Sequence, residues 1–514
     1  MMKKAGYAAL KEMYGLPDIP HHVTSYIVSG ARKTVDHQEY YPPIYAPEDT
    51  LGGHLEFAFK FEGVNLGLLT ELFAVTPIND LVSYIQSKPN GINTRRAWFY
   101  YEFLTGEQLD IPDLDSTVGY VDALDPKAYV VRTGARMQRY RVRNNLLGNQ
   151  HFCPVVRKTE VLKQYSWENL RDHAAAIVSS YDAETLARAV NYLYTKETRS
   201  SFAIEHEEPT ATKMERFGKA LQSVRKFPHL DKQALIDLQS IMLDERFAAS
   251  DYRDDQNYVG ETVGRREIFH FISPKPEDVS QLMQGLIDFL ASSDDIDPVV
   301  VAAVASFGFV FIHPFDDGNG RTHRYMIHHT LANRGVTPEG VIFPVSATML
   351  NHVHEYDACL ESFSKAIKPL IDFVSNDDAS IEVLNETVNL YRYFDATRMA
   401  EYLYACVDAT IEGELKVELQ TVSAFAHARK AIDAAFDLPE KQKNLFLKLC
   451  WQGKGQISKA KRKSHFGVFT DDEIDMMQRL VAPYFAVESG AKQRGQVLQS
   501  YIFAAYVHTY LNSK

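Results

Sequence analysis

The chain has 514 residues, of which 45% are hydrophobic and 12% aromatic, and its formal net charge is −12. This composition supplies ample apolar side chains for a folded core, and the length exceeds that of a usual single domain, so we expect two or three domains. The acidic balance argues against a general affinity for nucleic acids, although it leaves room for a local basic patch.

The sequence offers no recognisable targeting or membrane segment. The stretch 7–15 behind the first lysines is short and interrupted by Lys11 and Glu12, and no stretch elsewhere is apolar enough to cross a bilayer. We therefore expect a cytoplasmic protein without a membrane partner, and secretion as an effector stays open. The cysteines are scattered without paired spacing, as is typical of reduced thiols; they are Cys153, Cys359, Cys406 and Cys450.

The N-terminal region, residues 1–154, has a mixed α/β pattern. It carries no residues to which a chemical role can be given, so docking of a target and simple structural support both stay open. The expected elements are helices at 54–73 and 78–86, an aromatic-rich segment at 97–105, and strands at 128–131 and 139–142.

The central region, residues 155–375, has helical periodicity almost throughout. Asp297 and Pro298 predict the start of an almost wholly apolar helix over 299–312, which we expect to lie buried in the centre of the domain. Amphipathic helices with Asp or Glu near their starts are predicted at 167–179, 182–194, 231–245 and 278–291.

A short hairpin is predicted within this helical region, at about 258–272. Gly260 and Gly264 supply turn conformations, and residues 268–272 are rich in strand-forming side chains. We expect two antiparallel strands here.

The segment 313–324 reads HPFDDGNGRTHR and holds most of the chemistry that the sequence offers. His313 closes the apolar helix, because the proline behind it cannot continue a helix, so the imidazole is presented at a helix end. Gly318 and Gly320 allow backbone conformations forbidden to other residues. Successive amides can then point at one anion, and Asn319 adds a side-chain donor.

A new helix then starts and runs to about Asn333, where Gly335 stops it. Its positive N-terminal end favours phosphate oxygens. Arg321 and Arg324 are three residues apart on one face, so both can reach a polyphosphate. Asp317, beside them, is suited to hold Mg²⁺.

The C-terminal region, residues 376–514, is predicted to be helical. Two candidate helices within 438–481 flank the basic stretch 453–463, which suggests a winged-helix-like or helix-turn-helix module, although basic turns of this kind are more often solvated loops. The clustered histidines do not fit a common zinc spacing, so we expect no zinc site; they are His323, His328 and His329.

The segment 313–324 resembles the signature of the Fic (filamentation induced by cAMP) family, His-x-Phe-x-Asp/Glu-Gly-Asn-Gly-Arg-x-x-Arg, and departs from it at no specified position. A turn that only joined two helices would need none of these charged residues. Many members carry a glutamate shortly before the histidine, which this chain lacks, but that position lies outside the chemistry. The resemblance implies a mainly α fold, with a Fic-type helical core and a small hairpin flap between a mixed α/β N-terminal region and a helical C-terminal region.

The resemblance further implies transfer of AMP from ATP to a Ser, Thr or Tyr hydroxyl of a protein, which includes the chain itself. His313 would be the general base, and Mg²⁺ (or Mn²⁺) on Asp317 would help the arginines to neutralise the triphosphate. A kinase branch carries lysine at the position of Gly320 and a phosphocholine-transferring branch carries alanine at that of Gly318, so AMP transfer is favoured. The implied nucleotide-binding residues are Asp317, Gly318, Asn319, Gly320, Arg321, Arg324 and, where relatives form the adenine pocket, Tyr356.

A second segment, at about 195–207, resembles the inhibitory Ser/Thr-x-x-x-Glu helix of the family, with Ser201 and Glu205 in the key places. In relatives this glutamate pairs with the arginine that corresponds to Arg324 and displaces the γ-phosphate, and in some it also orients water to remove AMP. An ordinary exposed glutamate is the alternative. His206 stands where relatives usually have glycine or asparagine. Homodimers that guard this brake occur among relatives.

The segment 258–272 resembles the family's flap, which pins a target backbone as an added strand, although a plain surface hairpin fits as well. Two classes of function stay open. One is a protein adenylyltransferase held inactive by Glu205, and the other is a regulatory or nucleic-acid-binding protein that acts through its C-terminal module. A Fic enzyme that transfers another phosphate-containing group is a further alternative.

Overall fold

The computed structural model describes residues 2–264, 266–376 and 380–485. Its described residues form two compact units. The predicted boundaries near 154 and 376 stay predictions, and residues 377–379 and 486–514 of the predicted C-terminal region lie outside the described residues. The first unit is drawn from Met1–Trp167, Ser223–Arg334 and His352–Ala405, and the second from Glu168–Gln222, Gly335–Asn351 and Cys406–Lys514.

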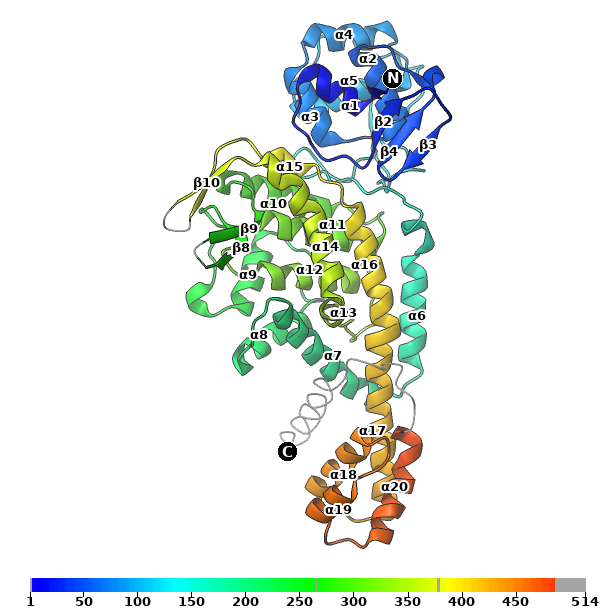
Figure 1. Ribbon diagram of the computed structural model, residues 1–514, viewed down its shortest axis with the longest axis vertical. Helices are drawn as coiled ribbons and strands as arrows, with labels where there is room; N and C mark the ends of the chain where they lie inside the picture. Colours follow the sequence, from blue (N-terminus) through cyan, green and yellow to red (C-terminus); the bar gives the residue numbers. More distant parts are fainter. Residues whose placement is uncertain (1, 265, 377–379, 486–514) are drawn as a thin grey trace. The chain divides into compact units, whose positions relative to one another are not determined.

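The N-terminal part of the first unit is mixed α/β, as predicted (Figure 1). Its four-stranded sheet has the order β1-β2-β4-β3, with β2 and β4 parallel and the other pairs antiparallel. The strands are β1 (Lys3–Ala5), β2 (Thr24–Ile27), β3 (Lys33–Val35) and β4 (Gln38–Tyr41), and the helices are α1 (Tyr7–Tyr14), α2 (Leu51–Phe57), α3 (Leu66–Val75), α4 (Ile78–Ser87) and α5 (Ile92–Thr105).

The single helix predicted over 54–73 is wrong, because the chain breaks it. A π-turn over Ala58–Glu62 ends at Gly63, whose φ of 85° is a left-handed conformation that stops a helix. The side chain of Asn65 then accepts from the Leu68 N–H at 3.0 Å and caps the start of α3. The apolar periodicity continues across the break, which explains the error.

The two strands predicted at 128–131 and 139–142 are displaced in the structure. Residues 128–131 contribute only an isolated bridge from Tyr129 to Arg157. Arg141 lies in the turn with φ of 54°, so the last strand starts at Val142, three residues later than predicted. The small sheet has the order β5-β7-β6, with β5 (Val121–Asp122), β6 (Ala135–Met137) and β7 (Val142–Asn144).

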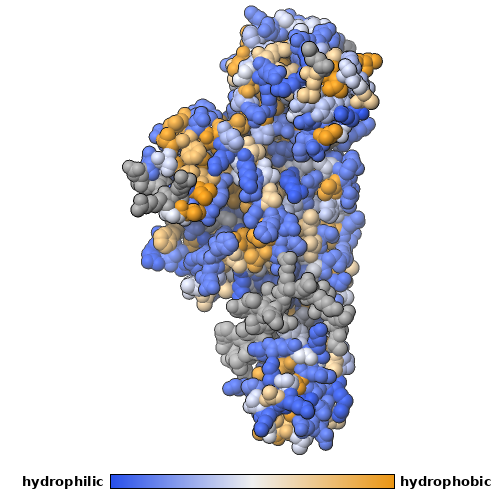
Figure 2. All heavy atoms as spheres, viewed as in Figure 1, coloured by the Kyte–Doolittle hydropathy of each residue, from blue (hydrophilic) through white to orange (hydrophobic). Residues whose placement is uncertain are grey.

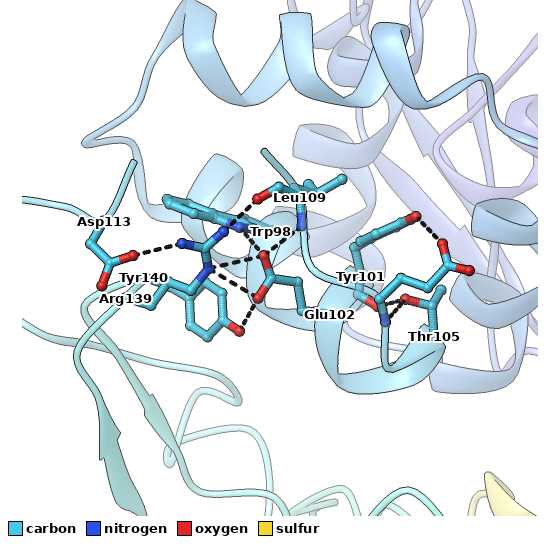
Figure 3. Close-up of polar contacts among 9 residues, drawn as sticks. Trp98, Tyr101, Glu102, Thr105, Leu109, Asp113, Arg139 and Tyr140 are labelled. Carbon is cyan, nitrogen blue, oxygen red and sulfur yellow. Dashed lines mark hydrogen bonds and ion pairs between the residues drawn. The ribbon is translucent and has the colours of Figure 1, made fainter. Parts of the chain in front are cut away.

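Glu102 on α5 joins this small sheet to the helices around it (Figure 3). Its carboxylate accepts from Trp98 Nε1 at 2.7 Å, from Arg139 Nε at 3.1 Å, from the Leu109 N–H at 3.0 Å and from the Tyr140 hydroxyl. Only 8% of its side chain is exposed. A buried carboxylate with this many donors is fully satisfied, so it holds the N-terminal core together without a separate chemical role.

The rest of the first unit surrounds two central helices. α11 (Pro298–Ile312) has the Asp297 side chain as its N-cap, accepting from the Val299 and Val300 N–H groups, and all but one of its residues are buried, as predicted. It packs against α12 and α10 (Figure 1). The other elements are α9 (Lys232–Met242), β8 (Tyr258–Val263), β9 (Arg266–Ile272), α10 (Pro276–Ala291), α12 (Asn319–Asn333), α14 (Val353–Ile367), β10 (Phe373–Ser375), β11 (Ile381–Val383), α15 (Val388–Arg392) and α16 (Thr397–Ala409).

The described residues of the second unit form helices joined by loops, with no strand among them. The predicted helix 182–194 is part of a longer one, α7 (Ala183–Ile204), whose N-cap Asp182 accepts from the Thr185 N–H at 2.9 Å. No strand of the kind a winged-helix fold needs occurs within 416–485, and the basic stretch is itself partly helical as α19. The other helices are α6 (Trp167–Ser179), α8 (Ala211–Gln222), α13 (Val345–Asn351), α17 (Lys416–Ala435), α18 (Glu440–Gln452), α19 (Lys459–His465) and α20 (Asp471–Phe485).

Within the described ranges, no single helix is both long and apolar enough to span a membrane. Only α3 and α4 taken together reach the required length and composition, and they are bent by 116°. All four cysteines are buried, and none of the four forms a disulfide. Figure 2 shows a mainly hydrophilic face with scattered hydrophobic patches.

Candidate active site

His313 ends α11 in a left-handed conformation, with φ of 53°. Its Nδ1 lies 3.1 Å from the carbonyl oxygen of Val310, so Nδ1 carries the proton and donates it, which leaves the lone pair on Nε2. Burial lowers the pKa of the imidazole to about 4, against the opposing effect of the Val310 bond and with a smaller contribution from the charge of Arg253. His313 is therefore neutral near pH 7, the form that a general base requires.

The loop behind His313 is closed by Asn319. The Asn319 Oδ1 accepts from the Phe315 N–H at 3.0 Å, and its Nδ2 donates to the Phe315 carbonyl at 2.6 Å. Gly318 has φ of 89°, while the nearest atoms to a Cβ built there are 3.6 Å away. Backbone conformation therefore requires the glycine at this position, and space does not.

Gly320 departs from the prediction. It is the second residue of α12 and adopts helical geometry, so the left-handed conformation expected at both glycines occurs only at Gly318. The first amides of α12 still form the positive end of a 15-residue helix, and this end directly follows the loop in the chain. An anion site at this end is thus kept by the helix itself.

The two arginines of the segment lie inside the protein. The side chains of Arg321 and Arg324 are 3% and 1% exposed, and Arg321 Nη2 lies 2.8 Å from Asp317 Oδ1. Both belong to the first two turns of α12, and their spacing of three residues puts them on one face of the helix.

Asp317 is the carboxylate best placed for a metal. Its side chain is 61% exposed, and Oδ1 accepts from the Gly318 N–H at 2.6 Å as well as from Arg321. No group of three or more His, Cys, Asp or Glu side chains that could hold a metal ion occurs in the part of the chain that the structure describes. One exposed carboxylate at a phosphate site fits Mg²⁺, which usually takes most of its ligands from water and phosphate.

The hairpin predicted at about 258–272 is present as β8 and β9, which pair antiparallel with a bulge between Val259 and Gly260. Val259, Val263 and Ile268 of this flap are exposed hydrophobic residues. On the buried side, the ring of Phe271 lies 6.4 Å from the His313 imidazole. The flap therefore lies next to the candidate base.

Tyr356 lies on α14 and is only 4% exposed. Its ring is 6.2 Å from that of His323 and 5.9 Å from that of Tyr402, so it packs in the core. The His323 Nδ1 donates to the Ser306 carbonyl at 2.7 Å, and burial lowers the pKa of His323 to about 3. The contact between Tyr356 and adenine stays a prediction.

Ser201 and Glu205 lie at the end of α7, in the second unit. The helix ends at Ile204, three residues before the predicted end, and Glu205 is its exposed C-cap while Ser201 is buried. His206 has φ of 55°, a conformation that glycine and asparagine adopt most readily.

Sequence reasoning missed Arg253 and Asn257, which the structure places against the loop. Arg253 Nε donates to the His313 carbonyl at 2.9 Å, and Asn257 Nδ2 donates to that of Phe315 at 3.3 Å. These partners are about sixty positions apart in the chain, and a polar segment before a hairpin has no periodicity that would reveal them.

Comparison with known proteins agrees with this geometry. Residues 229–331 match the sequence model of the Fic/DOC family, a range that includes α9, the flap, α10, α11 and most of α12. This part of the chain is a Fic/DOC-family domain. The predicted class, a mainly α fold with a Fic-type core, is confirmed.

The curated relatives share only this part. The chain is 32% identical over 130 residues to "Protein adenylyltransferase Fic" of Nematostella vectensis, covering 25% of this chain and 27% of that protein. It is 31% identical over 173 residues to the protein of the same name from Drosophila willistoni, covering 33% and 30%. The chain thus spans less than a third of the length of either relative.

Two solved structures are similar at low identity. A Fic family protein from Desulfovibrio desulfuricans G20 aligns with a TM-score of 0.36 and 18% identity over 59% of this chain and 87% of that one. Fic-1 (residues 134–508) from C. elegans aligns with a TM-score of 0.35 and 16% identity over 72% and 92%.

Proposed function

We propose that the chain is a protein adenylyltransferase, which transfers AMP from ATP to a serine, threonine or tyrosine hydroxyl of a protein, itself included. The observation that carries this proposal is the neutral His313 at the end of α11, with Nε2 as its basic atom and the N-terminus of α12 directly behind the loop. The names of the curated relatives support the same activity.

In this mechanism, Nε2 of His313 takes the proton of the target hydroxyl while its oxygen attacks the α-phosphorus of ATP. A new O–P bond forms, the bond from the α-phosphorus to the bridging oxygen breaks, and pyrophosphate leaves with that electron pair. The α12 amides, Arg321 and Arg324 offset the charge of the triphosphate. Asp317 would hold Mg²⁺ or Mn²⁺, whose charge assists them.

The flap binds the second substrate, the target protein, in this proposal. A target segment would add to the flap as a further strand, so backbone bonds would fix its hydroxyl near His313 without demanding one sequence. The position of the Phe271 ring, 6.4 Å from the His313 imidazole, supports this arrangement. The kinase branch carries lysine at the position of Gly320. Glycine at this position favours transfer of AMP over transfer of phosphate.

Inhibition by Glu205 is part of the proposal. Its carboxylate is exposed at the end of α7, and the burial of Arg324 supports a resting state in which ATP cannot use that arginine. Removal of AMP by the same glutamate, a guarding homodimer, nucleic-acid binding by the C-terminal module and a cytoplasmic location stay predictions.

The test is peptide mass spectrometry of the Glu205→Gly protein and an added mixture of cell proteins after incubation with ATP and Mg²⁺. AMP-sized additions on Ser, Thr or Tyr peptides are expected. Phosphate-sized additions would move the assignment to phosphoryl transfer, and unmodified peptides would contradict the proposal.

A further inference from the structure

Three successive backbone carbonyls of the signature loop are held by one short segment that precedes the flap. Arg253 Nε donates to the carbonyl of His313 at 2.9 Å, and the Arg253 backbone N–H donates to that of Pro314 at 2.9 Å. Asn257 Nδ2 donates to that of Phe315 at 3.3 Å. Residues outside the loop therefore help to fix the backbone of His313 and of the two residues after it.

The same guanidinium also binds the base of the flap. Arg253 Nη2 donates to the Pro274 carbonyl at 2.6 Å, two residues beyond the end of β9, and Nη1 donates to the Asp255 carbonyl at 2.7 Å. The residue is only 5% exposed. All three guanidinium nitrogens are thus directed at carbonyl oxygens, and the planar fork joins the end of α11 to the root of the flap.

The root of the flap is itself fixed. Ser273 Oγ donates to the Asn257 carbonyl at 2.7 Å, and the Tyr391 hydroxyl donates to the Ile272 carbonyl at 2.6 Å. These bonds join both ends of the hairpin to each other and to α15. A rigid flap root gives Arg253 a fixed support from which to hold His313.

His313 needs such support because its backbone conformation is unfavourable. A left-handed φ costs a residue with a side chain on the order of 1 kcal/mol, and it persists only when surrounding bonds impose it. The hydrogen bond from Arg253 is made to the backbone carbonyl of His313 itself, the residue with the left-handed φ. Loss of the bond would allow the backbone, and with it the imidazole, to turn.

We propose that Arg253 is a positioning residue, which holds the His313 imidazole in its reactive direction and fixes the distance between that base and the flap. This inference rests on the proposed AMP transfer, and it adds the residue that couples the target-binding hairpin to the base. Arg253 touches neither ATP nor the target hydroxyl in this account. It acts through the backbone carbonyls that it binds, those of His313, Pro314 and Pro274.

Arg95 on α5 provides a matched control. It is 3% exposed, and its guanidinium also binds three backbone carbonyls, those of Tyr140 at 3.0 Å, Gly119 at 2.8 Å and Arg141. It belongs to the N-terminal core around the small sheet. Substitutions at the two arginines remove the same kind of interaction, and only one set is next to His313.

The experiment compares Arg253→Lys, Arg253→Gln, Arg95→Lys and Arg95→Gln in the Glu205→Gly protein. A misplaced base should lower kcat for AMP transfer about 10- to 100-fold in both Arg253 variants, with KM for ATP changed less than about threefold. The Arg95 variants should lose comparable melting temperature but keep kcat within about twofold. Equal kcat for Arg253 and Arg95 variants of equal stability would overturn the proposal.

A second readout does not need catalysis. Diethyl pyrocarbonate modifies neutral imidazoles, and peptide mass spectrometry gives the rate at His313 in protein without ATP. Arg253→Lys and Arg253→Gln should change this rate severalfold, whereas the Arg95 variants should not. If the Glu205→Gly protein transfers no AMP, the proposed function fails, and this rate still decides whether Arg253 positions His313. An unchanged rate in folded Arg253 variants overturns the inference.

Discussion

The side-chain amide of Asn319 binds both backbone polar groups of Phe315, accepting from its N–H at 3.0 Å and donating to its carbonyl at 2.6 Å. Both residues are buried. This pair of bonds closes the loop between α11 and α12, so Asn319 sets where the helix N-terminus lies relative to His313. The asparagine of the signature thus has a structural task besides any contact with phosphate.

Replacement of Asn319 by alanine should destabilise the protein, because it leaves the buried Phe315 N–H without its acceptor and the Phe315 carbonyl with only the longer bond from Asn257. The expected loss is about 2–4 kcal/mol of unfolding free energy. Thermal melting against the parent protein measures it. An unchanged melting temperature together with lost ATP binding would assign Asn319 to phosphate alone.

Gly318→Ala should cost about 1 kcal/mol from backbone strain, since φ is 89° and the nearest atoms leave room for a methyl group. Gly335→Ala is the matched control, because Gly335 has φ of 75° and no neighbour within 4 Å. The two variants should melt alike, but only Gly318→Ala should weaken ATP binding, as isothermal titration would show. Equal ATP affinity of the two variants would show that the Gly318 amide is not part of the anion site.

The pH dependence of AMP transfer follows from the lowered pKa of His313. A general base works in its neutral form, so kcat/KM should stay level as pH falls and decline only as pH approaches the pKa of about 4. An ordinary histidine would already lose activity near its usual pKa of about 6.5. Circular dichroism at each pH must show that the protein stays folded. An acidic limb near the ordinary value would contradict the burial of the base.

Glu102→Ala should destabilise the N-terminal core by about 3–5 kcal/mol, because Arg139 and three further donors lose a buried acceptor (Figure 3). Glu107→Ala is the control, since Glu107 is exposed and its carboxylate accepts from the Tyr101 hydroxyl at 3.1 Å. Urea unfolding should separate the two variants. Comparable midpoints would show that the Glu102 cluster contributes little.

The local rules of the sequence predicted the ends of the site helices well. Asp297 and Pro298 start α11, the proline after His313 stops it, and Gly335 follows α12. Each is a property of a few adjacent residues, so no tertiary information was needed. The hairpin at 258–272 was predicted for the same reason.

The failures have a different origin. At Gly320 the helix starts earlier than the glycine pattern suggested, so the residue needs no special φ. The helix over 54–73 was broken by Gly63 and recapped by Asn65, although its apolar spacing continues. The bonds from Arg253 join positions sixty apart, and no periodicity within either segment encodes such a pairing.

The central claim is that His313 is the base for transfer of AMP. The most direct measurement uses ATP labelled at the α-phosphorus and, in a separate reaction, ATP labelled at the γ-phosphorus. The label that becomes attached to protein is measured for the Glu205→Gly variant and for the double variant that also carries His313→Ala. The Glu205→Gly protein is expected to carry label from the α-phosphorus and none from the γ-phosphorus. The double variant is expected to carry no α-label. Equal α-label with both variants, or label from the γ-phosphorus, would contradict it.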